Sequence, residues 1–237
     1  MSLRIPDLLF AGVTAMGVLP RVAGAQVGHP PERSPYFDLR AKQAASVIGG
    51  FIGGSRGKAG VGPANGAVIG IRYDHAIGTP VDIILGLYGA RLQRYVVNPN
   101  LAVALRTSGP INQDLILMET GLSLVLTGRK TWHSFAPYLG GTFGVGFETA
   151  LAEDASGYSF GTKGMLAPHI GLKWYPAQSF TIKIEGRDYF WRLSYPAQFS
   201  IPPAGTTLPA VLAGSNAAPD WTMHPSVMVS LGYTFTL

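Results

Sequence analysis

Cysteine is absent from the 237 residues of this chain, so the sequence forms neither a disulfide framework nor a thiolate metal site. Charged residues are also scarce. They make up 13% of the chain, against about 25% in a typical soluble domain. The formal net charge is +5, but lysine and arginine form no long run. The composition therefore gives no support for nucleic-acid binding.

Long apolar runs are missing too, apart from one near the start. The stretch 8–19 is apolar, but it is shorter than the roughly 20 residues that a membrane helix needs. Arg4 precedes it, and Ala23-Gly24-Ala25 follows with the small-x-small pattern of a cleavage site. We predict a signal peptide over 1–25, cleaved after Ala25. A retained anchor is the alternative.

The rest of the chain divides into a short lead-in and one β domain. Residues 26–41 are rich in proline and charge, which predicts an irregular periplasmic N-terminal segment. Residues 42–237 contain eight strand-like segments separated by turn residues. We place these segments at 42–55, 66–75, 80–95, 112–127, 134–149, 163–175, 179–194 and 224–236.

Most of these segments alternate between an apolar and a polar face. In 224–236, for example, Val227, Val229 and Leu231 alternate with serine and glycine. The polar faces carry mostly small residues and few charges, which suits the lumen of a narrow barrel better than a solvated surface. The pattern therefore predicts an eight-stranded antiparallel up-and-down transmembrane barrel, with its apolar face toward lipid. A soluble periplasmic barrel with an apolar core is the alternative.

The connections support the same topology. The even-numbered connections are short, at 76–79, 128–133 and 176–178, whereas the odd-numbered ones, at 56–65, 96–111, 150–162 and 195–223, are long. Short periplasmic turns and long outer loops are typical of outer-membrane barrels, with both termini periplasmic. The longest connection, 195–223, is a recognition element, a lid, or a loop with no ligand.

Aromatic residues gather near the expected strand ends. Membrane barrels place aromatic girdles at both interfaces, and we assign to them Tyr88, Tyr95, Trp132, Phe135, Trp174, Tyr175, Phe190, Trp191 and Trp221.

The final residues, SLGYTFTL, carry a family resemblance. Leu231, Tyr233 and Phe235 resemble the C-terminal signature of bacterial outer-membrane β-barrels, with Leu237 in place of the usual terminal aromatic. The segments APYLGGTFGVGFE and KIEGRDYF are similar to strands of the small OmpA-like and OmpW-like barrels. The resemblance implies a multi-pass outer-membrane protein, surrounded by outer-membrane lipid and inserted by the barrel-assembly machinery.

The polar strand faces also carry ionisable residues that we expect to meet in the lumen. Unpaired charges there would be costly, so they must pair. The network is either a satisfied set of charges that closes the lumen or a gate for ions or protons. Its expected members are Arg72, Asp74, Glu119, Glu148, Lys173, Lys183, Glu185 and Arg187.

Signals for catalysis are weak. The one adjacent His/Ser pair, His133-Ser134, falls at a periplasmic turn. No two histidines have metal-ligand spacing, so we assign no catalytic residue, metal or cofactor. The sequence favours a structural or surface-interaction role, with a surface ligand that it does not name. The alternatives are a narrow pore or conduit for small hydrophobic molecules and a lipid-modifying enzyme.

Overall fold

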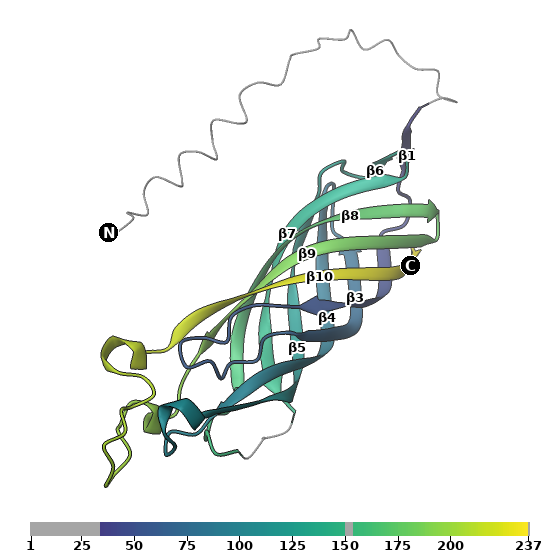
Figure 1. Cartoon of the computed structure of the whole chain (residues 1–237). Coiled ribbons are helices and arrows are strands. Elements are labelled where there is room, and N and C mark those ends of the chain that lie inside the picture. The colour runs from purple at the N-terminus through teal and green to yellow at the C-terminus, as the bar shows by residue number, and fades with distance from the viewer. Residues whose placement is uncertain (1–33, 150–153, 237) are drawn as a thin grey trace, which may run out of the picture. The chain divides into compact units, whose positions relative to one another are not determined.

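Eight antiparallel strands form a closed barrel (Figure 1). The computed structural model describes residues 34–149 and 154–236. Each barrel strand pairs with the next along the chain, and the last pairs with the first, so the hydrogen-bond ladder closes. The barrel strands are β2 (Gln43–Ile52), β3 (Gly66–Ala76), β4 (Val81–Val97), β5 (Thr107–Val125), β7 (Phe135–Glu148), β8 (Thr162–Ala177), β9 (Phe180–Leu193) and β10 (Asp220–Phe235).

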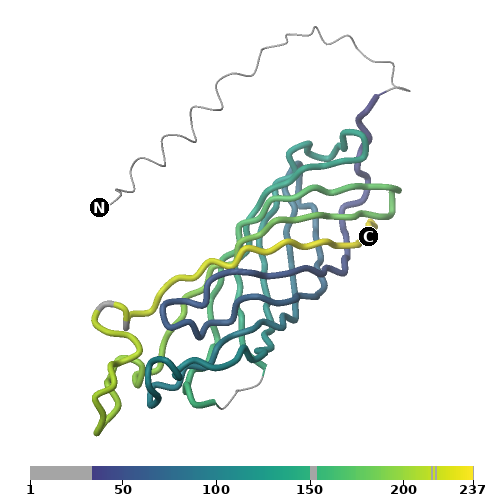
Figure 2. The backbone as a smooth tube through the Cα atoms, in the orientation of Figure 1, coloured from purple at the N-terminus to yellow at the C-terminus, as the bar shows by residue number. Residues whose placement is uncertain are grey.

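The two ends of the barrel differ in the length of their connections (Figure 2). At one end, which we name the turn end, the strands are joined by 77–80, 126–134 and 178–179. At the other, the loop end, they are joined by 53–65, 98–106, 149–161 and 194–219. Two of the three turn-end connections are shorter than any loop-end connection, but 126–134 is as long as 98–106. The predicted alternation of short and long connections is therefore only partly present.

In their described residues, the loop-end connections contain three short 3-10 helices, at Val103–Leu105, Ala197–Phe199 and Gly214–Ala217. None of the helices in the described part of the chain is long and apolar enough to cross a membrane.

Two short strands lie outside the barrel wall, at the turn end. Strand β1 (Tyr36–Asp38) pairs antiparallel with β6 (Lys130–Trp132), which lies in the connection between β5 and β7. The prediction of an irregular segment over 26–41 was therefore wrong for its last part, where the β1 backbone finds a partner across the turn end. The expected signal peptide, 1–25, lies outside the described residues.

The predicted strands match the observed ones closely, except that β4 and β5 are longer. They enclose a loop of only 98–106, where the sequence predicted 96–111. Gly109 and Pro110 lie within β5, opposite a register shift between Arg94 and Val96. Proline lacks a backbone N–H, and a strand accommodates it where the ladder is already interrupted. Strand β10 also begins earlier than predicted, at Asp220.

The outward face of the barrel is apolar, as the alternation predicts. On β10, Val227 and Leu231 lie exposed outside while Ser226 and Ser230 are buried inside. Ile170 on β8 is 64% exposed. The glycine-rich strand β2, whose faces the sequence left unassigned, also alternates, and its outward positions include Phe51.

The inward face differs from its predicted character in one half of the barrel. Near the turn end, small and charged residues surround a minor cluster of Val125, Ala136 and Tyr138. The half near the loop end is instead lined by large apolar side chains such as Ile52, Leu92 and Met165. Tyr88 and Trp191, expected in interfacial girdles, are buried inside. Trp191 lies near the end of β9 but at an inward position, so strand register overrode proximity to the strand end. Tyr88 lies in the middle of β4, also on the inward face.

Inward glycines let neighbouring strands pack closely. A Cβ at Gly144 on β7 would lie 2.0 Å from the backbone oxygen of Met118 on β5. Gly141, on the outward face of the same strand, would meet nothing within 4 Å. The two glycines therefore differ in their packing, although both belong to one strand.

We predict that Gly144→Ala lowers the free energy of unfolding by about 1–3 kcal/mol, the usual cost of overpacking, because the new Cβ collides with a backbone atom that cannot rotate away. Gly141→Ala is the matched control and should have little effect. Urea titration of both variants checks this. Equal losses in the two would contradict the packing argument.

Candidate functional site

A network of buried ion pairs crosses the middle of the lumen. Its centre is Arg72 on β3, whose guanidinium lies 2.7 Å from Glu185 on β9 and 3.0 Å from Asp74 on its own strand. All three side chains are buried. Because inward positions of a strand recur every second residue, Arg72 and Asp74 project to the same side and meet the charges of β9 across the lumen.

Arg187 extends the network toward the loop end. Its guanidinium pairs with Glu185, at 2.7 Å, and with Glu119 of β5. Glu119 also accepts hydrogen bonds from the Tyr88 hydroxyl at 2.8 Å and from the Thr142 hydroxyl at 2.9 Å. These hydroxyls satisfy carboxylate oxygens that would otherwise be desolvated without a partner.

Two lysines form the turn-end part of the network. Lys183 pairs with Asp74, and Lys173 lies 2.6 Å from Asp82. Asp82 was not among the residues expected in the lumen. It is buried inside the barrel between the outward positions Val81 and Ile83 of β4, so alternation was the signal that could have found it.

Glu148, by contrast, lies apart from the other expected members of the network. Its carboxylate accepts hydrogen bonds from Gln113, at 2.6 Å, from the Ser159 hydroxyl, at 2.8 Å, and from the backbone N–H of Phe160, at 2.7 Å. It ties the loop after β7 to the barrel wall at the loop end. The structure therefore brings seven of the expected charges together with Asp82, and leaves Glu148 elsewhere.

Charges in this network balance. The cations are Arg72, Lys173, Lys183 and Arg187, and the carboxylates are Asp74, Asp82, Glu119 and Glu185. Each group contacts at least one of opposite sign, which is what burial of a charge requires. The pairs Arg72–Glu185 and Arg187–Glu119 also join different strands across the interior of the barrel.

Above the network, three connections fold into the loop end and pack as an apolar plug. We define this plug by its buried residues: Val61 from 53–65, Tyr158 and Phe160 from 149–161, and Phe199 and Leu212 from 194–219. Phe160 contacts the Trp191 ring edge-on, with centroids 5.6 Å apart. The longest connection therefore packs against the barrel mouth, which is one of the arrangements expected for it.

A buried ion pair holds the middle connection of the plug in place. Arg94 of β4 is buried and pairs with Asp154. Burial alone would raise the pKa of Asp154, but hydrogen bonds from Ser156 and the Arg94 guanidinium outweigh it and hold that pKa below its ordinary value. Asp154 therefore stays ionised and keeps the loop attached.

Tyr195 joins two other connections of the plug. Its hydroxyl accepts a hydrogen bond from the backbone N–H of Lys58 at 2.8 Å and donates one to Asp220 at 2.5 Å. Gly57 lies directly beneath with φ of +73°, and a Cβ there would be 2.3 Å from the Tyr195 hydroxyl oxygen. Only glycine fits this position, for both conformational and steric reasons.

Two histidines in the described part of the chain, His133 and His224, form no hydrogen bond with a carboxylate. His133 and Ser134 lie side by side in the turn before β7, both with positive φ. His224 is buried, stacked on Trp191 with centroids 4.0 Å apart, and bonded to the Thr222 hydroxyl. Among residues 34–149 and 154–236, no group of three potential ligands is placed to hold a metal ion.

The C-terminal residues of the family resemblance lie on β10. Leu231 and Tyr233 are exposed on the outward face, and Phe235 is the last residue of the strand. Leu237 lies outside the described residues.

Comparisons with known proteins give matches among solved structures alone: no family model and no curated protein matches the chain. The N-terminal barrel domain of Pseudomonas aeruginosa OprF is 10% identical, over 83% of this chain and 100% of that one, with a TM-score of 0.44. OprG from Pseudomonas aeruginosa is 12% identical over 83% and 98%, with a TM-score of 0.46. Neisserial surface protein A is 11% identical over 85% and 98%, with a TM-score of 0.47.

We predict that Glu185→Gln lowers the free energy of unfolding by about 3–5 kcal/mol, because it leaves two buried guanidinium groups short of a carboxylate. Asp114→Asn is the control, since Asp114 pairs at 2.7 Å with Arg91 on the exposed surface, where ion pairs contribute little. Urea titrations of the two variants in one detergent compare their free energies of unfolding. A loss at Glu185 no larger than that at Asp114 would show that the network does not stabilise the barrel.

For the plug, we predict that Asp154→Asn accelerates hydrogen exchange at the amides of Tyr158 and Phe160. The lowered pKa of Asp154 means that its contribution is present above the unfolded value of about 3.9 and is lost as the pH falls through the folded value. The wild type should therefore loosen in acid, while the variant stays loose throughout. Unchanged hydrogen exchange in the variant would show that the Arg94–Asp154 ion pair does not hold this connection in place.

Proposed function

We propose that this chain is a bacterial outer-membrane β-barrel with a structural or surface-interaction role and a lumen closed by its charge network. The observation that carries the proposal is the outward apolar face. Large side chains such as Ile69, Ile170 and Leu231 lie exposed around the closed wall. A soluble protein does not expose so much contiguous apolar surface, whereas a membrane barrel turns such a face toward lipid.

An aromatic belt at the turn end supports the same setting. Phe135 lies beside Trp174 with ring centroids 6.3 Å apart, and Phe180 contacts Tyr233 edge-on at 5.9 Å. Trp132 is exposed nearby on β6. Aromatic side chains favour the boundary between hydrocarbon and water, so this belt fits the periplasmic interface of the proposed topology.

Loops at the other end supply the surface-interaction part of the proposal. Arg106 donates a hydrogen bond to the backbone oxygen of Pro209, at 2.8 Å, and so joins the connections 98–106 and 194–219. Val103, Leu105 and Ile201 are exposed on these two connections. An ordered apolar tip on a rigid barrel is suited to contact a partner.

Biogenesis follows from the same proposal. Export would use the signal peptide expected over 1–25, and insertion would use the barrel-assembly machinery. By their resemblance to the C-terminal signature of outer-membrane barrels, the residues that this machinery would recognise are Leu231, Tyr233, Phe235 and Leu237. Outer-membrane lipid would then surround the outward face.

One pair of substitutions tests the membrane setting. Ile170 on the barrel wall and Ile201 in an outer loop are 64% and 62% exposed, so arginine at either site would be tolerated equally in water. In a bilayer we predict that Ile170→Arg costs about 2–4 kcal/mol while Ile201→Arg costs little. Folding titrations into lipid vesicles measure both. Equal and small costs would mean that the wall does not face lipid.

Closure of the lumen has its own test. We expect no steady unitary current from the protein in planar bilayers, because in this proposal the ion pairs in the middle and the plug at the loop end close the lumen. Steady currents would favour the alternative of a narrow pore or conduit. A lipid-modifying activity would instead change the lipid A mass spectrum on overexpression, which the proposal does not predict.

A further inference from the structure

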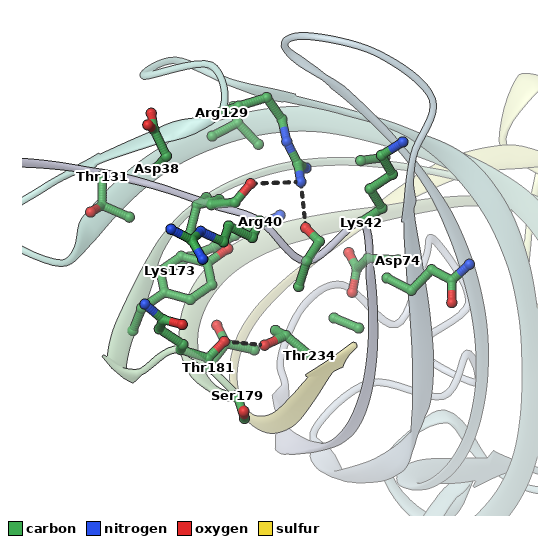
Figure 3. A pocket seen from close by; sticks show the side chains of 18 of the residues that line it. Asp38, Arg40, Lys42, Asp74, Arg129, Thr131, Lys173, Ser179, Thr181 and Thr234 are labelled. Atoms are coloured by element: carbon green, nitrogen blue, oxygen red, sulfur yellow. Dashed lines mark hydrogen bonds between the residues drawn. The ribbon is translucent and has the colours of Figure 1, made fainter. Parts of the chain in front are cut away.

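A cavity of about 490 Å³ opens at the turn end, beneath the charge network (Figure 3). One side is formed by the segment 37–44, which leads from β1 into the barrel, and the other by the ends of β8, β9 and β10. Arg129 holds that segment in place by donating hydrogen bonds to the backbone oxygens of Leu39, at 3.0 Å, and Ala41. The volume of the cavity lies within the range of small-molecule sites.

The cavity carries surplus positive charge. The network above it is balanced, with Lys183 held by Asp74 and Lys173 by Asp82. The rim then adds Arg40, Lys42 and Arg129 against Asp38. An anion entering the cavity would therefore meet cations that are not already neutralised.

Polar groups at the base of the cavity also have unused hydrogen-bonding capacity. Lys173 and Lys183 are 3% and 2% exposed, and in the described residues each ammonium has one hydrogen-bond acceptor, although it carries three donors. The hydroxyl of Thr181, which lines the same cavity, is buried and has no hydrogen-bond partner. These groups are placed to bind the oxygens of a ligand.

Gln43, which also lines the cavity, has an unused hydrogen-bond acceptor. The side-chain oxygen of Gln43 is buried without a hydrogen-bond partner, and it lines the same cavity. A ligand that carries a hydroxyl group as well as a negative charge would satisfy both Gln43 and the lysines.

We propose that the turn-end cavity binds a small hydroxylated organic anion, with its phosphate or carboxylate group on Lys173, Lys183 and Thr181. Arg40 and Lys42 attract the anion at the rim, and the side-chain oxygen of Gln43 accepts a hydrogen bond from the hydroxyl group of the ligand. Under the proposed topology the site opens to the periplasm. Ligand binding depends only on the residues of the cavity, so it can be tested separately from the membrane setting.

Calorimetric titration with glycerol 3-phosphate tests the site in the full-length mature protein in neutral detergent. We expect saturable binding, no binding of glycerol, and an affinity about tenfold weaker in the double variant Arg40→Gln/Lys42→Gln. Both residues are exposed on the rim, so the barrel should still fold. Lys130→Gln is the matched control: Lys130 is exposed at the same end on β6 but does not line the cavity.

The outcomes separate clearly. An affinity that falls in the double variant and holds in Lys130→Gln supports the site. No saturable binding, or equal weakening in the control, overturns it. In nanodiscs, competition by phosphatidylglycerol and not by phosphatidylcholine would identify a lipid headgroup as the source of the anion, and its absence a free solute. If Ile170→Arg were tolerated in lipid while binding persisted, the site would stand without the membrane setting.

Discussion

Closure of the backbone ladder between β10 and β2 is the constraint on which the rest of the structure depends. An open sheet with this sequence would leave strand edges unpaired, and in lipid each unpaired backbone group is costly. Once the wall is closed, alternation along every strand divides the side chains between two environments. A largely apolar set lies outside, and the other set must be packed inside the closed wall.

The interior meets that demand in three different ways along the barrel. Near the loop end, large apolar side chains of the wall pack against the three connections of the plug. In the middle, arginines and carboxylates pair across the lumen. At the turn end the packing is incomplete, and the polar cavity remains. The barrel is thus stabilised by unlike interactions at each level, and the cavity at the turn end has space for a ligand.

Sequence pattern predicted the architecture and most of the lumen charges, because alternation fixes which residues face inward. It did not predict how inward residues combine. Glu148 alternates as the network residues do, yet it bonds to Ser159 and Phe160, which only the folded loop brings near. Trp191 resembled a girdle residue, but its register places it inside. The plug and the cavity depend on loops whose path no local periodicity encodes.

In the proposed setting the outward face lies against lipid and the inward face does not. Tryptophan fluorescence tests it directly, since Trp174 is 42% exposed on the wall while Trp191 is fully buried inside. In single-tryptophan variants folded into vesicles, lipids brominated on their acyl chains should quench Trp174 strongly and Trp191 little. Equal quenching of the two, or quenching of Trp191 alone, would contradict the account.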